Sequence, residues 1–152
     1  MNPSDKLSFH FTLAEMIASD TAIRNGWTNY PDPQSIENLK RTCALLEQVR
    51  TLFLSPIVDI SGFRSKQVND AVGSTDASQH RRGCAADFKI AGYSPDEVCR
   101  RIIQAGIQFD QLIREYNRWT HISVPNDPDG PWRGQALIID SKATGYRPFI
   151  LR

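Results

Sequence analysis

Two short segments in which the two faces alternate place the tightest constraint on the fold. Asp87 lies on the more polar face of residues 84–90, and His121 lies on the more polar face of residues 119–124. Successive side chains of a strand point to opposite faces, so Asp87 and His121 leave the apolar side of their strands. We therefore expect two neighbouring strands that present one polar group each on the same face, close to the loop that carries His80.

His80, Asp87 and His121 are residue types that bind zinc, and the first two are seven positions apart. Three protein ligands leave a fourth position open for water, which is typical of catalytic rather than structural zinc sites. A lone histidine in a strand is more often a satisfied polar residue, and a lone aspartate near a loop is more often a cap. The prediction of a Zn²⁺ site therefore depends on the order of the residues, and this ligand set could also accept other divalent ions.

The order of residues resembles that of a known family. Residues 78–87 follow Ser-x-His-x-x-Gly-x-Ala-x-Asp, and residues 119–121 follow Trp-x-His. This order resembles the M15 type of zinc metallopeptidases, which includes D,D-carboxypeptidases, D-Ala-D-Ala dipeptidases and phage L-alanyl-D-glutamate endopeptidases. The resemblance extends from about residue 57 to residue 124. It implies a zinc ion on the three ligands and hydrolysis of a peptide bond in the peptidoglycan stem.

The resemblance also implies two substrate-binding residues. In the family, Ser-Gly-Tyr/Phe-Arg-Ser carries an arginine that approaches the substrate, and Arg64 matches it in residues 61–65. An arginine can bind a carboxylate or polarise the scissile carbonyl, because its fork of donors is always charged. Ser78 matches a family serine that can hydrogen-bond the substrate; the alternative is a turn residue.

Hydrolysis also needs a carboxylate that takes the proton of the attacking water. Many family members have this acid three residues before the second histidine, where this chain has Arg118. Glu115 ends the segment Phe-Asp-Gln-Leu-Ile-Arg-Glu, which resembles one in phage-type members. With a hairpin turn at about Asn117, Glu115 lies across from Trp119 and within reach of the metal face. We predict that Glu115 is the general base.

Two alternatives to this assignment stay open. Asp110 is a second candidate base, although its position along the strand places it on the opposite face from Glu115. Glu115 could instead be a surface carboxylate that pairs with Arg114 or Arg118.

The remaining patterns predict a single α+β domain over residues 1–152. Caps, prolines at the first helical position and apolar spacings of three to four predict helices at residues 12–19, 33–54, 66–72 and 95–105. Apolar or alternating runs predict strands at residues 57–61, 84–90, 109–115, 118–124 and 136–140. We expect a small, mainly antiparallel sheet with helices on one face and the zinc site on the other, similar to hedgehog and D,D-peptidase domains.

The composition limits which kinds of partner and which compartment we expect for the protein. With 23% charged residues and a net charge of +1, nothing indicates binding to nucleic acid or to an acidic membrane surface. Cys43, Cys84 and Cys99 lack metal-ligand spacing, so we expect buried free thiols in a reducing compartment. The first eleven residues lack a cationic start followed by an apolar run. We therefore expect synthesis in the cytoplasm without a signal peptide, and action on the cell wall after lysis or delivery.

The sequence thus predicts a zinc peptidase of phage or prophage origin that acts on the peptidoglycan stem peptide, delivered with a holin or as part of a virion. A D,D-carboxypeptidase and an endolysin-type endopeptidase both remain open. The alternative from another class is a non-catalytic zinc-binding module of the same fold, for example a virion component.

Overall fold

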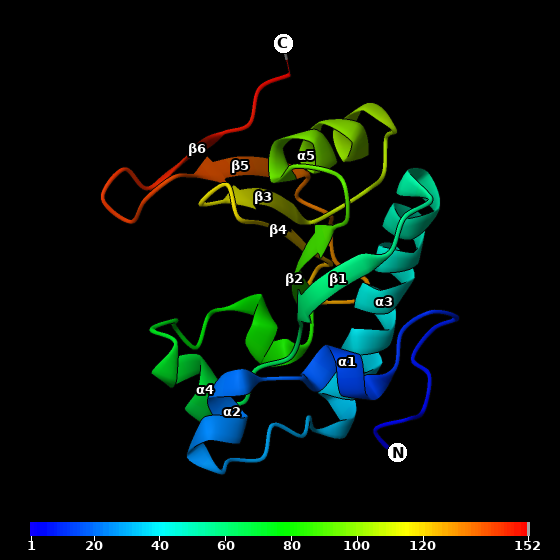
Figure 1. The fold of residues 1–152 in the computed structure, drawn as a ribbon, viewed down its shortest axis with the longest axis vertical. Helices are drawn as coiled ribbons and strands as arrows, with labels where there is room; N and C mark the ends of the chain where they lie inside the picture. Colours follow the sequence, from blue (N-terminus) through cyan, green and yellow to red (C-terminus); the bar gives the residue numbers. More distant parts are fainter. Residues whose placement is uncertain (152) are drawn as a thin grey trace.

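A six-stranded sheet forms the centre of the molecule in the computed structural model, which describes residues 1–151. The strands are β1 (Ile57–Ser61), β2 (Ala85–Ile90), β3 (Gln111–Glu115), β4 (Trp119–Ser123), β5 (Gln135–Ile139) and β6 (Tyr146–Pro148). Their order across the sheet is β1-β2-β4-β3-β5-β6 (Figure 1). Every neighbouring pair is antiparallel except β3 and β5, which are parallel. The predicted α+β class and mainly antiparallel sheet are confirmed.

The helices are α1 (Leu13–Ile17), α2 (Asp20–Asn25), α3 (Pro33–Phe53), α4 (Lys66–Ala71) and α5 (Pro95–Gln104), with the 3₁₀ helix η1 (Gln79–Arg82). The first helix ends at Ile17, before the predicted end, because the Ser19 hydroxyl accepts the Ala22 N–H and begins α2. The sequence did not predict α2. No helix in residues 1–151 combines the length and the apolar character that a membrane crossing requires.

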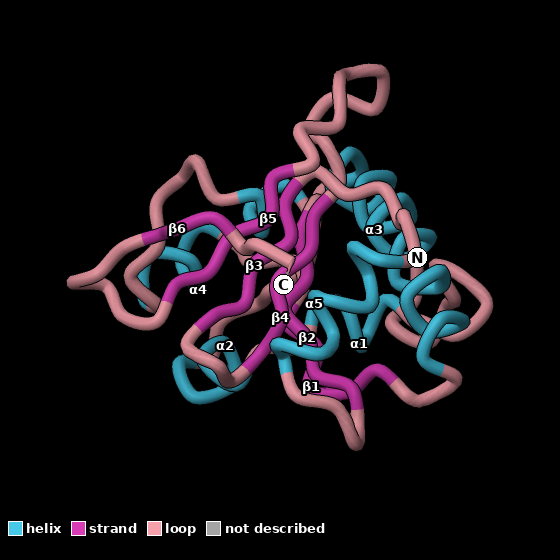
Figure 2. The backbone as a smooth tube through the Cα atoms, turned by 90° about the horizontal axis from the view of Figure 1, so that it is seen from above, coloured by secondary structure: helices cyan, strands magenta, loops and turns pink. Residues whose placement is uncertain are grey.

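Helix α3 begins and ends as the sequence predicts. The Asp32 carboxylate accepts the Ser35 N–H at 2.7 Å, and Pro33 occupies the first helical position, where a missing N–H does no harm. Leu54 ends the helix in the left-handed conformation. The apolar side of α3 then packs along the sheet, and α4 lies on the opposite side of the strands (Figure 2).

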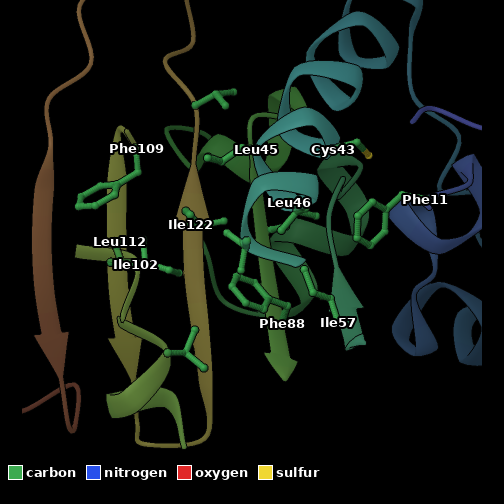
Figure 3. Packing of buried hydrophobic residues seen from close by; sticks show 14 of the residues in the cluster. Phe11, Cys43, Leu45, Leu46, Ile57, Phe88, Ile102, Phe109, Leu112 and Ile122 are labelled. Carbon is green, nitrogen blue, oxygen red and sulfur yellow. The ribbon is translucent and has the colours of Figure 1, made fainter. Parts of the chain in front are cut away.

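The core lies between the sheet and helices α3 and α5 (Figure 3). Its largest fully buried side chains from these elements are Leu39, Leu45, Leu46, Phe88, Ile102, Leu112 and Ile122. Burial of each such side chain stabilises the fold by roughly 1.5–3 kcal/mol. Helices α3 and α5 therefore cover the apolar face of the sheet, and polar residues can occupy the opposite face.

The hairpin of β3 and β4 turns where the sequence predicts. Tyr116 and Asn117 both have positive φ, and the Arg118 N–H donates to the Glu115 carbonyl at 3.0 Å. This turn pairs Glu115 with Trp119 across the hairpin. The predicted position of Glu115 is therefore correct.

The end of the sheet differs from the prediction. Strand β5 forms near its predicted place, but it pairs in parallel with β3, because residues 124–134 carry the chain back along the sheet. The sequence did not predict β6, since Tyr146–Pro148 is too short to show an alternation. The three cysteines are buried and free, as expected.

Polar residues of α3 hold the loop that carries His80. The Asn38 amide donates to the Arg82 carbonyl at 2.9 Å, and the Thr42 hydroxyl donates to the Gly83 carbonyl at 2.7 Å. Gly83 ends η1 with φ of +76°, and a Cβ there would lie 2.6 Å from the Ser35 carbonyl oxygen. Only glycine lets the loop pack this closely on α3.

Alanine at Gly83 should therefore destabilise the fold more than alanine at Gly73. Both positions have positive φ, +76° and +79°, but a Cβ at Gly73 would have no heavy atom within 4 Å. Both variants carry about 1–2 kcal/mol of left-handed strain, and we expect Gly83→Ala to lose a further ~1–3 kcal/mol of unfolding free energy from overpacking. Chemical denaturation measures the difference, and equal losses would contradict the close contact between η1 and α3.

Candidate metal and catalytic site

Strand register brings three of the predicted site residues to one point. Asp87 on β2 lies directly opposite His121 on β4. His80 reaches the same point from η1, which joins the sheet through Gly83. All three residues are buried, and a ligand atom of each lies within 4.8 Å of those of the other two.

The Asp87 carboxylate is the centre of this His80–Asp87–His121 cluster. Its Oδ1 lies 2.9 Å from His121 Nδ1 and 3.3 Å from His80 Nε2. The other oxygen, Oδ2, lies 3.3 Å from the Arg64 guanidinium. One carboxylate therefore meets both imidazoles and a guanidinium.

The backbone fixes the tautomer of His80. His80 Nδ1 lies 2.7 Å from the Gly62 carbonyl oxygen, which only accepts, so Nδ1 carries the proton and donates it. In the neutral ring Nε2 then has a lone pair, and it faces the Asp87 carboxylate. The Nε2 lone pair and the carboxylate oxygen are both acceptors, so they repel each other. A cation bound between them would stabilise this arrangement.

The three side chains differ in how burial and charge affect their pKa values. Burial lowers the pKa of His80 despite the nearby Asp87 carboxylate, so the ring is kept neutral. Burial alone would also lower the pKa of His121, but the hydrogen bond and charge of Asp87 outweigh it and raise this pKa. Burial would raise the pKa of Asp87, yet the two imidazoles hold it well below its usual range. Asp87 is therefore a carboxylate at every ordinary pH.

These side chains fit a zinc ion. Ligand distances of about 2.0–2.1 Å at a tetrahedral centre place donor atoms roughly 3.3 Å apart. The separations of 3.3 Å and 2.9 Å between Asp87 Oδ1 and the two imidazole nitrogens are close to this value. A neutral His80 held by a carbonyl, a second imidazole and an ionised carboxylate form a donor set suited to a divalent metal.

Glu115 lies beside the cluster. Its Oε1 is 3.6 Å from His121 Nδ1, and its Oε2 accepts a hydrogen bond from the Trp119 indole N–H at 2.8 Å. Burial and then the charge of Asp87 raise the pKa of Glu115 above its ordinary value. Arg114 pairs with Asp96 and Asp140 instead of Glu115. The structure therefore gives no support to a surface ion pair for Glu115.

Arg64 and Ser78 line the space in front of the cluster. Besides its contact with Asp87, Arg64 borders both cavities described below. Ser78 borders one of them, and its hydroxyl also accepts the His80 N–H at 3.3 Å, as a cap of η1. Ser78 thus combines a place at the cavity with the turn role that the sequence left open.

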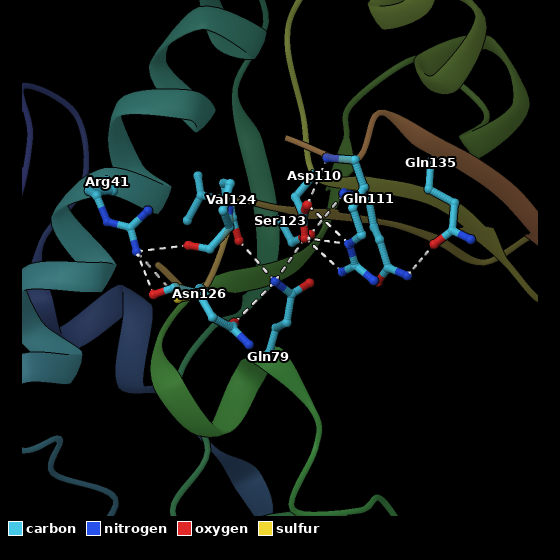
Figure 4. A network of polar contacts seen from close by, with 11 residues as sticks. Arg41, Gln79, Asp110, Gln111, Ser123, Val124, Asn126 and Gln135 are labelled. Carbon is cyan, nitrogen blue, oxygen red and sulfur yellow. Dashed lines mark hydrogen bonds and ion pairs between the residues drawn. The ribbon is translucent and has the colours of Figure 1, made fainter. Parts of the chain in front are cut away.

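Asp110 belongs to a different network, which Figure 4 shows. It is buried, and it pairs with the Arg133 guanidinium at 2.7 Å and accepts from the Gln79 amide at 3.1 Å. The same amide donates to the Val124 carbonyl at 2.9 Å. Asp110 therefore joins η1 to the ends of β3 and β4, which supports a structural role for it. His10 pairs with Glu47 near the surface, away from the cluster.

Two adjoining cavities meet at the cluster and form one cleft with two arms. The larger arm, of about 760 Å³, is bordered by Phe63, Val68 and Trp119 among others. The smaller arm, of about 440 Å³, is more polar. The residues that border both arms are Arg64, Val72, Asp87, Glu115, Tyr116 and Lys142. An extended chain could therefore pass across the cluster from one arm to the other.

Comparison with known proteins identifies the family of the chain. A family model described as Peptidase M15 matches residues 9–123, which include η1, β2, β3 and β4. The chain belongs to the peptidase M15 family. M15 peptidases are metalloenzymes, so membership indicates a metallopeptidase. No curated protein matches the chain.

Several groups at this M15 site were not predicted from the sequence. The Gly62 carbonyl and the Trp119 indole N–H contact His80 and Glu115, respectively. The Trp-x-His order could have indicated that Trp119 lies at the site, because residues two positions apart in a strand share a face, and Trp119 therefore lies on the same face as His121. Lys142 and Tyr146 border the cleft from the hairpin of β5 and β6. The parallel pairing of β5 with the distant β3 brings this hairpin to the cleft, and no local sequence pattern predicts that pairing.

Zinc should stabilise the protein only when His80 is present. At a free zinc concentration a hundredfold above Kd, binding to the folded state adds about 2.7 kcal/mol to the unfolding free energy. We expect a rise in the thermal unfolding midpoint for the wild type and for His10→Ala, and none for His80→Ala. His10→Ala is the matched control, because it removes a histidine far from the cluster. An equal rise in all three proteins would contradict this site.

Zinc affinity should also fall with falling pH. A proton and the metal compete for His121 Nδ1, and the raised pKa of His121 places this competition above the ordinary histidine value of 6.5. Affinity is therefore full above the raised pKa and decreases by roughly tenfold per pH unit below it. Calorimetric titrations across this range measure the change. A constant affinity would exclude His121 as a ligand.

Proposed function

We propose that this M15 protein is a zinc-dependent peptidase that hydrolyses a peptide bond in the peptidoglycan stem. The observation that carries the proposal is the Glu115 carboxylate, which lies 3.6 Å from His121 in a cleft open on both sides of the cluster. A metal-binding module needs the three ligands alone. Hydrolysis needs this fourth group as well.

In this proposal His80 Nε2, Asp87 and His121 Nδ1 hold the zinc ion. When bound, zinc supplies Lewis acidity toward the scissile carbonyl and toward the attacking water. The protein contributes orientation: the Gly62 carbonyl holds the His80 ring, and β-sheet register holds Asp87 opposite His121.

Glu115 is the general base in this proposal. Its Oε1 accepts a proton as water attacks the carbonyl carbon, and it returns this proton to the leaving amine when the C–N bond breaks. A pKa above the ordinary glutamate value suits a group that must both take and give a proton. The Trp119 N–H holds Oε2, so Oε1 is the oxygen on the side of His121.

Arg64 and Ser78 are the proposed substrate-binding residues. Only 15% of the Arg64 side chain is exposed, and one guanidinium nitrogen contacts Asp87 Oδ2. Its remaining donors can bind a substrate carbonyl or carboxylate at the junction of the two arms. Ser78 can donate its hydroxyl proton to substrate, because its contact with His80 uses the oxygen as an acceptor.

The stem peptide and a phage or prophage origin are supported by the residue patterns. The order of residues 78–87 resembles that of enzymes that act on this polymer, and residues 109–115 resemble phage-type members. We propose that the protein reaches the wall after lysis, or through delivery with a holin or a virion. One arm of the cleft could hold the part of the peptide before the cut bond, and the other arm could hold the part after it.

Glu115→Gln should abolish most hydrolysis and leave zinc bound. Loss of the general base reduces kcat/KM by roughly a hundredfold to ten-thousandfold, because the amide cannot accept the proton. Purified peptidoglycan and synthetic stem peptides serve as substrates, with new free amino groups and released fragments measured by mass spectrometry. Zinc content is measured on the same samples.

Glu97→Gln is the matched control, since Glu97 is an exposed residue of α5. We expect it to retain wild-type hydrolysis. Intact walls and peptides after incubation with zinc-loaded wild-type protein would contradict the proposal, and they would favour a zinc-binding structural or binding module. Full activity of Glu115→Gln would contradict the assignment of the base alone.

A further inference from the structure

The loop between β5 and β6 forms part of the cleft wall. It places Lys142 at the border of both arms and leads to Tyr146, which borders the smaller arm with His80, Asp87 and His121. This loop lies beyond residues 9–123, the part that matches the family. Its residues are therefore candidates for a property that is particular to this chain.

Lys142 differs from the other cations that border the cleft. Arg64 contacts Asp87 at 3.3 Å, and Arg133 contacts Asp110 at 2.7 Å. Lys89 likewise has Asp59 at 3.9 Å as a partner. Within residues 1–151, Lys142 has no carboxylate within 4.0 Å, and its side chain is exposed.

Lys142 therefore offers an ammonium group that is free to bind an anion.

Tyr146 offers a second donor near the same place. Strand register aligns Glu115 with Ile139 and Ile139 with Tyr146, so the Tyr146 ring lies on the cluster side of the sheet. Desolvation and the Glu115 carboxylate raise the pKa of Tyr146, so its hydroxyl keeps its proton. Within the described residues this hydroxyl makes no hydrogen bond, and it is free to donate.

We infer that Lys142 and Tyr146 form a subsite for a carboxylate of the substrate peptide in the wall of the smaller arm, which they border together with the cluster. A carboxylate accepts a charge-assisted bond from the ammonium and a second bond from the hydroxyl. Arg64 and the zinc ion of the proposed function would together offset the negative charges of Asp87 and Glu115, so the site does not prevent the approach of an anion. This inference rests on the proposed peptidase function and adds two specificity-determining residues, Lys142 and Tyr146, that lie outside the part of the chain that matches the family.

A pair of stem peptides tests the subsite directly. Each peptide contains one glutamate of the stem. The two peptides are identical except that the α-carboxyl group of this glutamate is free in one and is a carboxamide in the other. Calorimetry measures their binding to zinc-loaded Glu115→Gln protein, so that hydrolysis does not interfere. We expect the free carboxylate to bind about five- to tenfold more tightly.

Substitutions in this background assign the preference to residues. Lys142→Gln should remove most of the preference, Lys142→Arg should keep it, and Tyr146→Phe should reduce it. Lys40→Gln is the control and should keep the full preference, because Lys40 is a partly exposed lysine of α3 that pairs with Glu37 and does not border the cleft. In each case binding of the carboxamide peptide should stay unchanged.

The outcomes separate this inference from the proposed function. Equal binding of both peptides, no binding of either, or a preference that survives Lys142→Gln would overturn the subsite. A preference that depends on Lys142, combined with no hydrolysis by the wild type, would leave the subsite standing and contradict the peptidase.

Discussion

The site depends on one pairing, that of Asp87 with His121 across β2 and β4. This pairing turns the carboxylate toward the second imidazole, and the glycine at the end of η1 brings the first imidazole to the same oxygen. A buried carboxylate is unfavourable without partners, and here it has two imidazoles and a guanidinium. The folding of the sheet therefore brings the three side chains of the cluster together.

The second constraint is the position of Glu115. It lies on β3, and the hairpin turn at Asn117 fixes it opposite Trp119, whose indole N–H binds one of its oxygens. Because Glu115 is diagonal to His121 on the same sheet face, its carboxylate stays close to the cluster although it is six positions away from His121 in sequence. A carboxylate therefore lies at the cluster although Arg118 occupies the position three residues before His121.

Much of this arrangement could be predicted from the sequence, because it depends on local rules. Strand parity placed Asp87 and His121 on one face, and the expected turn placed Glu115 across from Trp119. The rest depends on contacts between distant segments. No local pattern shows that the Gly62 carbonyl sets the tautomer of His80, or that β5 pairs in parallel with β3 and brings Lys142 to the cleft.

The most direct measurement of the central claim is a crystal structure of the zinc-soaked protein, with anomalous diffraction collected on both sides of the zinc absorption edge. The account predicts one strong anomalous peak, bound by His80 Nε2, Asp87 and His121 Nδ1, with the Gly62 contact to His80 preserved and Glu115 close by but not bound to the metal. A peak at another place, or a ligand set that lacks Asp87 or uses Glu115 in its place, would contradict it.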